Sequence, residues 1–354
     1  MDNHTGDIRR ARRALLTGPR SHRRAGTVLV TAALLSAMTA GVAHADRGTT
    51  GSEGGSQGQE VFAQVSISQS GGSSGGGGSL TPTSTSWSPP ACYYAPTHTP
   101  SEFKAQFEDY KNNTPLHSGK GEAVRWHEET YGKASEYEDH NLRKEGEGMW
   151  WRGHMNMSHP DLEGRLACNE PPFWVDFGDA PPAMPGVITT RMLSEMAYQA
   201  LRVPDTEVEL SPVDVQTVNL DTWAWLDGAT FGPVSVTASL AGWNLSATTT
   251  ATPTGLGIEP GTGDARVYPA SGTCPVNGDG TIGTPYSSPR AEDTPPCGMR
   301  YLRATTGRSP YPMRATVTWE VSWSGSDGGG GDLPDGVYGS TQDMTVQEVQ
   351  AIVR

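Results

Sequence analysis

The sequence predicts a mainly β protein, in which a two-sheet β-sandwich follows a smaller helical region and a disordered N-terminal segment. From about residue 205 onward, Thr, Val, Gly and Trp dominate, and apolar residues alternate with polar ones. Short alternating segments separated by turn residues are typical of an all-β sandwich. The segments predicted as strands are Glu207–Val213, Leu220–Leu226, Val234–Leu240, Leu245–Thr250, Met299–Thr305, Met313–Trp323 and Met344–Val353.

Met313–Trp323 shows the alternation most clearly, because all its odd-numbered positions are apolar and all its even-numbered positions are polar. Successive side chains of a strand point to opposite faces of the sheet, so one face of this strand is expected to be buried and the other wetter. Tyr311, just before this strand, is a candidate for the tyrosine corner of an immunoglobulin-like domain.

Residues 91–202 form a charged and mostly helical region. Thr99, Pro100 and Glu102 provide a capping side chain, a proline at the first helical position and an acidic residue three positions after the cap, so a helix is predicted to begin there. Two more helices are predicted at Glu122–Tyr131 and from about Thr190 to Arg202.

Residues 46–90 are predicted to be a disordered linker, because Gly, Ser, Thr and Pro dominate them. Such a composition buries too little apolar surface to offset the entropy of ordering. Val61–Ile67 interrupts the linker with alternating apolar residues. This segment is predicted to be a short strand at most, with pairing to a later sheet as one option.

Residues 1–45 have the layout of a secretory signal peptide. Seven arginines precede an apolar run that begins at Val28 and ends at Ala43-His44-Ala45. Cleavage is predicted between Ala45 and Asp46, with Ala43 as the second small residue that the cleavage rule requires. The run is shorter than the about 20 residues of a spanning helix, and an uncleaved anchor is the alternative. The mature chain is therefore expected to be secreted or cell-wall associated, with no membrane span.

Removal of the leader makes the chain more acidic. Its seven Arg and two Asp carry a net charge of +5, so the formal charge of −13 becomes −18 in the mature chain. An acidic surface repels phosphate backbones and anionic membranes, so nucleic acid is not expected as a partner.

The four cysteines are Cys92, Cys168, Cys274 and Cys297, and all lie beyond the predicted cleavage site. An even number of cysteines in an exported chain indicates disulfides. Of the three possible pairings, Cys92–Cys168 with Cys274–Cys297 is favoured because each bond stays within one compositional region. The spacing of a zinc site is missing, so no metal is expected.

A resemblance covers roughly residues 171–354. Pro171-Pro172-Phe173-Trp174, the segment Val218–Leu226, Gly283-Thr284-Pro285-Tyr286 and the segment Ala315–Trp323 resemble those of an uncharacterised group of secreted actinobacterial proteins. The C-terminal part also resembles a PKD-type immunoglobulin-like β-sandwich. It departs from that pattern at Ile258–Asp264, where the usual Trp-Asp-x-Gly-Asp-Gly is degraded. The resemblance implies a fold and a location outside the cell, but no activity.

Several enzyme classes lack their motifs in this chain. There is no P-loop, and Gly255–Pro260 matches a dinucleotide fingerprint only in part, because Pro replaces the third Gly. There is no Gly-x-Ser-x-Gly nucleophile elbow either. No cofactor is therefore expected.

The histidines of the helical region are a second candidate site. His127 is followed by Glu-Glu-Thr-Tyr, which is not the His-Glu-x-x-His of a zinc protease. Wide spacings separate the remaining ones, which are His117, His140, His154 and His159. Solvated or locally hydrogen-bonded side chains are expected, with a metal or catalytic site as the alternative. Asn277–Gly280 resembles the middle of a calcium loop, but Pro275 and Tyr286 occupy its first and last ligand positions, so a turn is expected.

The tryptophans are the strongest functional candidates. Trp223 and Trp225 share one face of a predicted strand, as do Trp319 and Trp323. Aromatic rows on a sheet can stack on sugar rings. The favoured interpretation, however, is that these four fill the core between the sheets, because Val317 and Val321 share the face of Trp319. Trp150-Trp151 is a further patch with the same two interpretations.

The expected function is a secreted or envelope-associated, non-enzymatic interaction protein whose partner is a cell-wall glycan or another envelope protein. The first alternative is glycan binding through exposed Trp223, Trp225, Trp319 or Trp323. The second is an extracellular hydrolase that combines a histidine of the helical region with Asp176 or Asp179.

Overall fold

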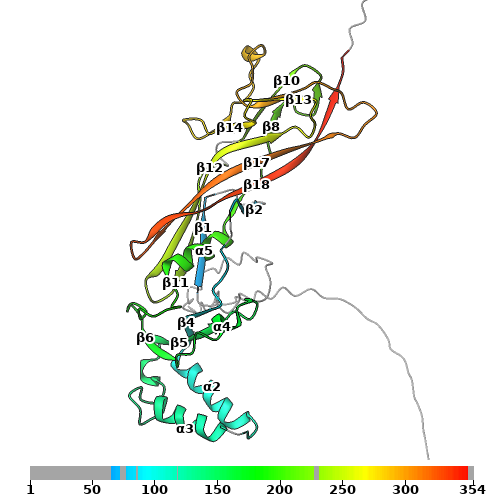
Figure 1. The fold of residues 1–354 in the computed structure, drawn as a ribbon. Coiled ribbons are helices and arrows are strands. Elements are labelled where there is room, and N and C mark those ends of the chain that lie inside the picture. Colours follow the sequence, from blue (N-terminus) through cyan, green and yellow to red (C-terminus); the bar gives the residue numbers. More distant parts are fainter. Residues whose placement is uncertain (1–64, 72–76, 85–86, 118, 227–230, 350–354) are drawn as a thin grey trace, which may run out of the picture. The chain divides into compact units, whose positions relative to one another are not determined.

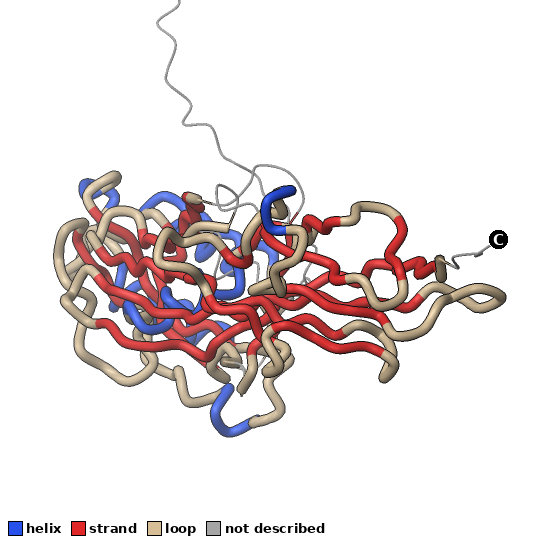
Figure 2. Tube along the Cα trace, turned by 90° about the horizontal axis from the view of Figure 1, so that it is seen from above, coloured by secondary structure: helices blue, strands red, loops and turns tan. Residues whose placement is uncertain are grey.

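The computed structural model describes residues 65–71, 77–84, 87–117, 119–226 and 231–349. The fold is mainly β with few helices, as the sequence predicts, and Figure 2 shows the strands as red layers. The predicted signal peptide and its predicted cleavage site, at Ala43, Ala45 and Asp46, lie outside the described residues.

The largest sheet has eight strands, in the order β1-β11-β12-β17-β18-β3, with β14 beside β12 and β9 beside β18. Its pairings are antiparallel except that of β9 with β18. Figure 1 shows β12, β17 and β18 as long neighbouring arrows. The strands are β1 (Val65–Ser70), β3 (Thr81–Pro82), β9 (Val215–Thr217), β11 (Val234–Leu240), β12 (Leu245–Glu259), β14 (Thr273–Pro275), β17 (Tyr311–Gly325) and β18 (Gly330–Gln347).

The alternation of the sequence fixes which face of this sheet is buried. The odd-numbered residues from Met313 to Val321 are all buried on β17, while the even-numbered ones are at least partly exposed. β11 alternates in the same way from Val234 to Leu240. The apolar face therefore forms one side of the core, as predicted from Met313–Trp323.

Two strands of this sheet are longer than the sequence predicts. β12 continues past Thr250 to Glu259, through a bulge between Pro253 and Gly255. β18 begins at Gly330, not at Met344, because it pairs with β17 directly after a tight turn. The Gly, Asp and Pro of its first half disfavour a strand intrinsically, but pairing with the adjacent β17 overrides this preference.

The second sheet has five strands in the order β13-β16-β10-β15, with β8 also on β10. A disulfide joins Cys274 of β14 in the first sheet to Cys297, directly before β16. These strands are β8 (Glu209–Ser211), β10 (Asp221–Leu226), β13 (Ala265–Tyr268), β15 (Ile282–Gly283) and β16 (Gly298–Tyr301).

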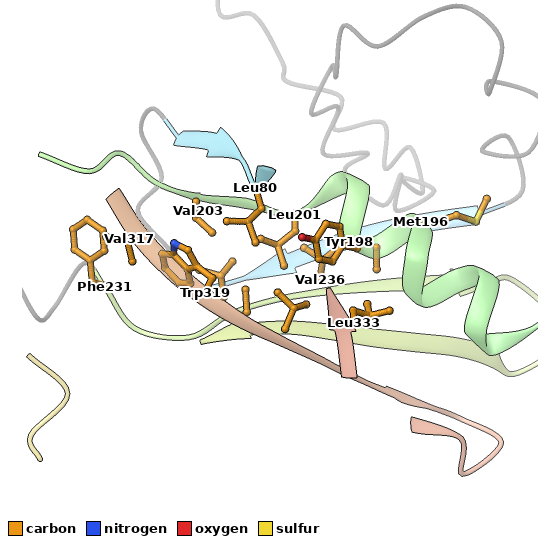
Figure 3. Close-up of a cluster of buried hydrophobic side chains, with 14 of the residues drawn as sticks. Leu80, Met196, Tyr198, Leu201, Val203, Phe231, Val236, Val317, Trp319 and Leu333 are labelled. Carbon is orange, nitrogen blue, oxygen red and sulfur yellow. The ribbon is translucent and has the colours of Figure 1, made fainter. Parts of the chain in front are cut away.

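One apolar core contains residues of both sheets and of helix α5 (Thr190–Ala200). Met196 and Tyr198 of α5 belong to this core together with Val236 and Leu333 of the large sheet (Figure 3). The Thr249 hydroxyl on β12 donates to the Ser194 carbonyl over 2.8 Å. The helix predicted at Thr190–Arg202 therefore packs with the β-sandwich, although the domain boundary was predicted after residue 202.

The charged region contains α2 (Pro100–Asn113), α3 (Lys120–Tyr131), the short α4 (Leu162–Arg165) and the 3-10 helix η1 (Leu142–Lys144). The predicted cap of α2 is present: the Thr99 hydroxyl accepts from the Glu102 amide, and the Glu102 carboxylate accepts from the Thr99 amide. Sequence reasoning missed a three-stranded sheet of β4 (Cys92–His98), β5 (Gly148–Met155) and β6 (Phe173–Asp176). Its central residues are buried on both faces, so no period-two pattern marks it.

A second disulfide joins Cys92 at the start of β4 to Cys168. Both disulfides have the pairing that the sequence favours, and bonds of this kind fit a protein of an oxidising compartment. None of the helices in the described part of the chain is long and apolar enough to cross a membrane.

Part of the predicted linker is paired. β1 lies against β11 from Val65 to Ser70, so the described part of the segment predicted at Val61–Ile67 is a strand that joins the large sheet. β2 (Gly77–Ser79) pairs with β7 (Arg202–Pro204), and β3 pairs with β18. Backbone hydrogen bonds to strands far along the chain thus order these Gly/Ser-rich segments without a core of their own.

Candidate functional site

A groove of about 590 Å³ lies where the end of α3 meets β6 and the loops on either side of it. Its wall combines aromatic rings, prolines and carboxylates. The described residues that line it are Thr130, Tyr131, Tyr137, Glu170, Pro171, Pro172, Phe173, Trp174, Val175, Asp176, Asp179, Ala180, Pro182 and Met184. Such a mixture of apolar surface with a few polar groups is typical of a ligand site.

Trp174 is held in place at this groove by polar contacts. Its indole Nε1 donates to Asp176 Oδ1 over 2.8 Å, and Lys144 Nζ donates to the same oxygen over 3.2 Å. The Lys144 ammonium also lies 5.9 Å from the centre of the Trp174 ring. The hydrogen bond from Trp174, and secondarily Lys144, lower the pKa of Asp176, so this carboxylate is ionised at neutral pH.

An aromatic cluster supports the groove from behind. Phe103, Tyr131 and Trp150 are buried together, and Tyr137 and Trp174 pack against them. The Tyr131 hydroxyl donates to the Pro172 carbonyl over 2.9 Å, which joins the end of α3 to the segment before β6. The groove is therefore preformed, and ligand binding requires little ordering of its wall.

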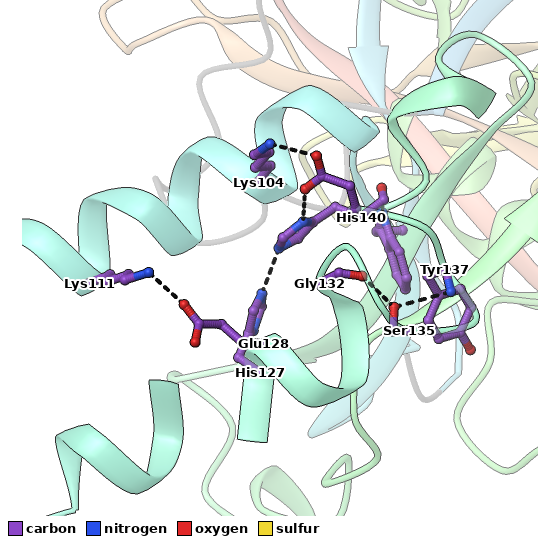
Figure 4. Close-up of polar contacts among 10 residues, drawn as sticks. Lys104, Lys111, His127, Glu128, Gly132, Ser135, Tyr137 and His140 are labelled. Atoms are coloured by element: carbon purple, nitrogen blue, oxygen red, sulfur yellow. Dashed lines mark hydrogen bonds and ion pairs between the residues drawn. The ribbon is translucent and has the colours of Figure 1, made fainter. Parts of the chain in front are cut away.

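A chain of polar side chains lies on the other side of this cluster (Figure 4). Lys104 Nζ donates to Asp139 over 2.9 Å, and the other Asp139 oxygen lies 3.3 Å from His140 Nδ1. His140 Nε2 lies 3.1 Å from His127 Nε2. An ionised carboxylate only accepts, so His140 donates from Nδ1 and its Nε2 accepts the proton of His127 Nε2.

A left-handed turn brings these side chains together. Glu138, Asp139, His140 and Asn141 have φ angles of 41°, 65°, 65° and 59°. The left-handed conformation costs about 1–2 kcal/mol per residue that has a Cβ, although Asp and Asn tolerate it better than most. The His140 amide donates to the Tyr131 carbonyl over 2.7 Å, and Trp150 Nε1 donates to the His140 carbonyl over 3.0 Å. These contacts hold the turn against the end of α3.

Burial keeps both histidines neutral. It lowers the pKa of His127 from 6.5 to about 4, with a smaller contribution from His140. Burial also lowers the pKa of His140, against the opposing hydrogen bond to Asp139. The His127 ring stacks on Phe107 with centroids 3.8 Å apart, so the pair joins α3 to α2. We name Lys104, Asp139, His140 and His127 the histidine chain.

The histidine chain was not predicted, because His127 and His140 are 13 residues apart and only the left-handed turn joins them. The two rings face each other through their Nε2 atoms, with centroids 5.2 Å apart, which is the geometry of a hydrogen bond between rings. Within the described residues, no three His, Cys, Asp or Glu side chains are placed to share a metal ion.

Two of the other predicted histidines, His154 and His159, have recorded contacts away from the histidine chain. His154 stacks on Tyr93 and its Nε2 lies 2.9 Å from the Thr97 hydroxyl. The His159 Nδ1 accepts from the Asp161 amide. The hydrogen bonds recorded for the Asp176 carboxylate in the described part of the chain are those from Lys144 and Trp174.

Two of the four candidate tryptophans are core residues. Trp223 is 3% exposed and Trp319 is fully buried, so neither can stack on a sugar. Trp225 and Trp323 are half-buried, and the Arg191 guanidinium lies 5.8 Å from the Trp323 ring. Trp150 and Trp151 are also buried. Trp223 and Trp319 therefore fill the core, as the favoured interpretation of the sequence has it, and the alternative of an exposed aromatic row does not hold for these two.

The calcium-like segment forms a turn. Asp279 accepts from both the amide and the hydroxyl of Thr281, and Asp264 forms an ion pair of 3.0 Å with Arg303.

Comparisons with protein-family models, with curated proteins and with solved structures found no match to this chain.

Proposed function

We propose that the chain is an exported, non-enzymatic binding module of the cell envelope or the extracellular medium, and that its ligand is a glycan bound in the groove beside Trp174. The observation that carries the proposal is the composition of the groove wall. Half-buried Trp174, Phe173 and Tyr137 face a preformed space together with carboxylates. Aromatic rings with polar neighbours suit the apolar faces and hydroxyl groups of sugars.

The contacts of the groove favour binding over hydrolysis. Cleavage of a glycosidic bond needs one carboxyl group that can donate a proton, which requires a raised pKa. The pKa of Asp176 is lowered instead, and its oxygens are already engaged by Trp174 and Lys144. Asp176 thus orients the Trp174 ring, which is a role suited to a binding site.

We also propose an immunoglobulin-like identity for the sandwich. Two mainly antiparallel sheets around one core support it, as does Tyr311. The Tyr311 hydroxyl lies 3.5 Å from the Arg303 carbonyl, eight residues upstream, which is the connection expected of a tyrosine corner. Such a sandwich acts as a rigid scaffold, and it leaves binding to the region that carries the groove.

Replacement of Trp174 by alanine is expected to weaken binding to an insoluble glycan by roughly tenfold or more, because the stacking surface is lost. The measurement is depletion of the purified mature chain from solution by peptidoglycan, chitin or cellulose. Trp225→Ala is the matched control, since Trp225 is also a half-buried tryptophan but lies on β10 and does not line the groove. Melting curves establish that both variants are folded.

Retention of the wild type by at least one polymer, lost in Trp174→Ala and kept in Trp225→Ala, supports the groove. The opposite pattern places the binding surface on the β-sandwich and overturns the assignment to the groove. Retention by none of the three polymers overturns the proposed function.

A further inference from the structure

We propose that the groove selects glycans that carry positively charged amino groups, such as oligomers of glucosamine, over neutral N-acetylated ones. This inference rests on the proposed function and adds the charge of the ligand to it. It is carried by an imbalance of charge at the groove, which has three carboxylates among its lining residues and no Lys, Arg or His among the described residues that line it.

The three carboxylates are not equivalent. Asp176 is balanced by Lys144, which lies 3.2 Å away. Glu170 and Asp179 are exposed and take part in none of the ion pairs recorded among the described residues. Glu170 and Asp179 thus have no recorded ion-pair partner in the described part of the chain, and these are the groups that a ligand ammonium would meet.

The backbone fixes the positions of these two acids. The Glu170 amide donates to the Tyr94 hydroxyl over 3.0 Å, and the Asp179 amide donates to the Asp176 carbonyl over 3.2 Å. Gly178, between β6 and Asp179, adopts a φ of 87°, which a side chain would strain. The two carboxylates thus stand at the two ends of β6, and Trp174 lies between them in the sequence.

The aromatic wall adds to the attraction for an ammonium group. The face of an indole or phenol ring is electronegative and attracts cations. The chain already uses this attraction internally, because the Lys144 ammonium lies 5.9 Å from the centre of the Trp174 ring. A glucosamine unit presents an apolar ring face and an ammonium group together, which matches a wall of aromatic rings beside unbalanced carboxylates.

The charge of the whole chain acts in the same direction. With a formal net charge of −13, the protein attracts polycations and repels polyanions at long range. Polyphosphate-containing and uronic-acid polymers of an envelope are therefore disfavoured as ligands, and the preference is expected to weaken when salt screens the charges.

The test compares two soluble ligands of the same length that differ in charge. One is a glucosamine oligomer and the other is the corresponding N-acetylglucosamine oligomer. Calorimetric titration of the full mature chain at about pH 6, where the amines are protonated, gives both dissociation constants. We expect the glucosamine oligomer to bind at least roughly tenfold more tightly, and about 0.5 M sodium chloride to remove most of that preference.

The double variant Glu170→Gln/Asp179→Asn is expected to lose the preference while keeping the affinity for the acetylated oligomer. Glu320→Gln/Asp343→Asn is the matched control, because it removes the same net charge at exposed positions on β17 and β18. Equal binding of the two oligomers by the wild type, or equal effects of the two double variants, would overturn the charge inference and leave the proposed function standing. Binding of neither oligomer would count against the proposed function itself.

Discussion

Replacement of Trp319 by alanine is expected to destabilise the protein by about 3–5 kcal/mol, which is typical of removing a large aromatic side chain from a core. Trp319 lies near the middle of β17 and none of its surface is exposed. Its ring lies beside Phe231 and Val317 under the segment that contains Leu201 and Val203 (Figure 3). The remaining wall belongs to paired strands, so it can collapse only in part around the cavity.

Urea denaturation measures this loss, and two further variants show its cause. The Trp319 Nε1 has no hydrogen-bond partner among the described residues, so Trp319→Phe is expected to retain more of the stability than Trp319→Ala. Trp323→Ala, at a half-buried position on the same face of β17, is expected to cost less than Trp319→Ala. A Trp319→Ala protein within about 1 kcal/mol of the wild type would show that Trp319 is not a core residue.

The same strand shows how much of the fold follows from local pattern. Met313–Trp323 was predicted correctly because each of its apolar side chains points to one face, and that face is buried. The first half of β18 was missed because Gly, Pro and Asp carry no such pattern, and its strand conformation comes from pairing with β17. The periodicity of apolar residues in a sequence indicates which face of an element is buried. It gives no signal where a strand forms through backbone pairing alone.

The candidate site was predicted less well than the fold, for a related reason. Pro171-Pro172-Phe173-Trp174 is one of the segments that carry the resemblance to secreted proteins. Its distance in sequence from Tyr131 and Tyr137 gives no indication that these two tyrosines line the same groove. Asp176 and Asp179 were proposed as partners of a histidine, whereas Asp176 positions Trp174. A positive φ at Asp139 and His140 has no dependable sequence signature, so the pairing of His140 with His127 emerges only from the tertiary structure.

The histidine chain makes stability depend on pH. The folded pKa of His127 is about 4 and its ordinary value is 6.5, so between these values the unfolded chain binds a proton that the folded chain does not. The free energy of unfolding is therefore expected to fall as the pH is lowered from about 6.5 to about 4. A loss on the order of 2 kcal/mol is expected, allowing for the partial exposure of His127. His140 adds to the loss in the same direction, because its pKa is also lowered.

Protonation would also break the bond between the rings, since two protonated Nε2 atoms cannot share a hydrogen bond. His127→Gln removes the titrating group while its amide still reaches toward His140, so thermal unfolding of this variant is expected to change less steeply over the same pH range. Its absolute stability falls at all pH values, because the ring no longer stacks on Phe107. The slope is therefore the informative quantity. His159→Gln, outside the histidine chain, should keep the wild-type slope. An unchanged slope in His127→Gln would show that acid destabilisation has its source elsewhere, among carboxylates of lowered pKa such as Asp139 and Asp176.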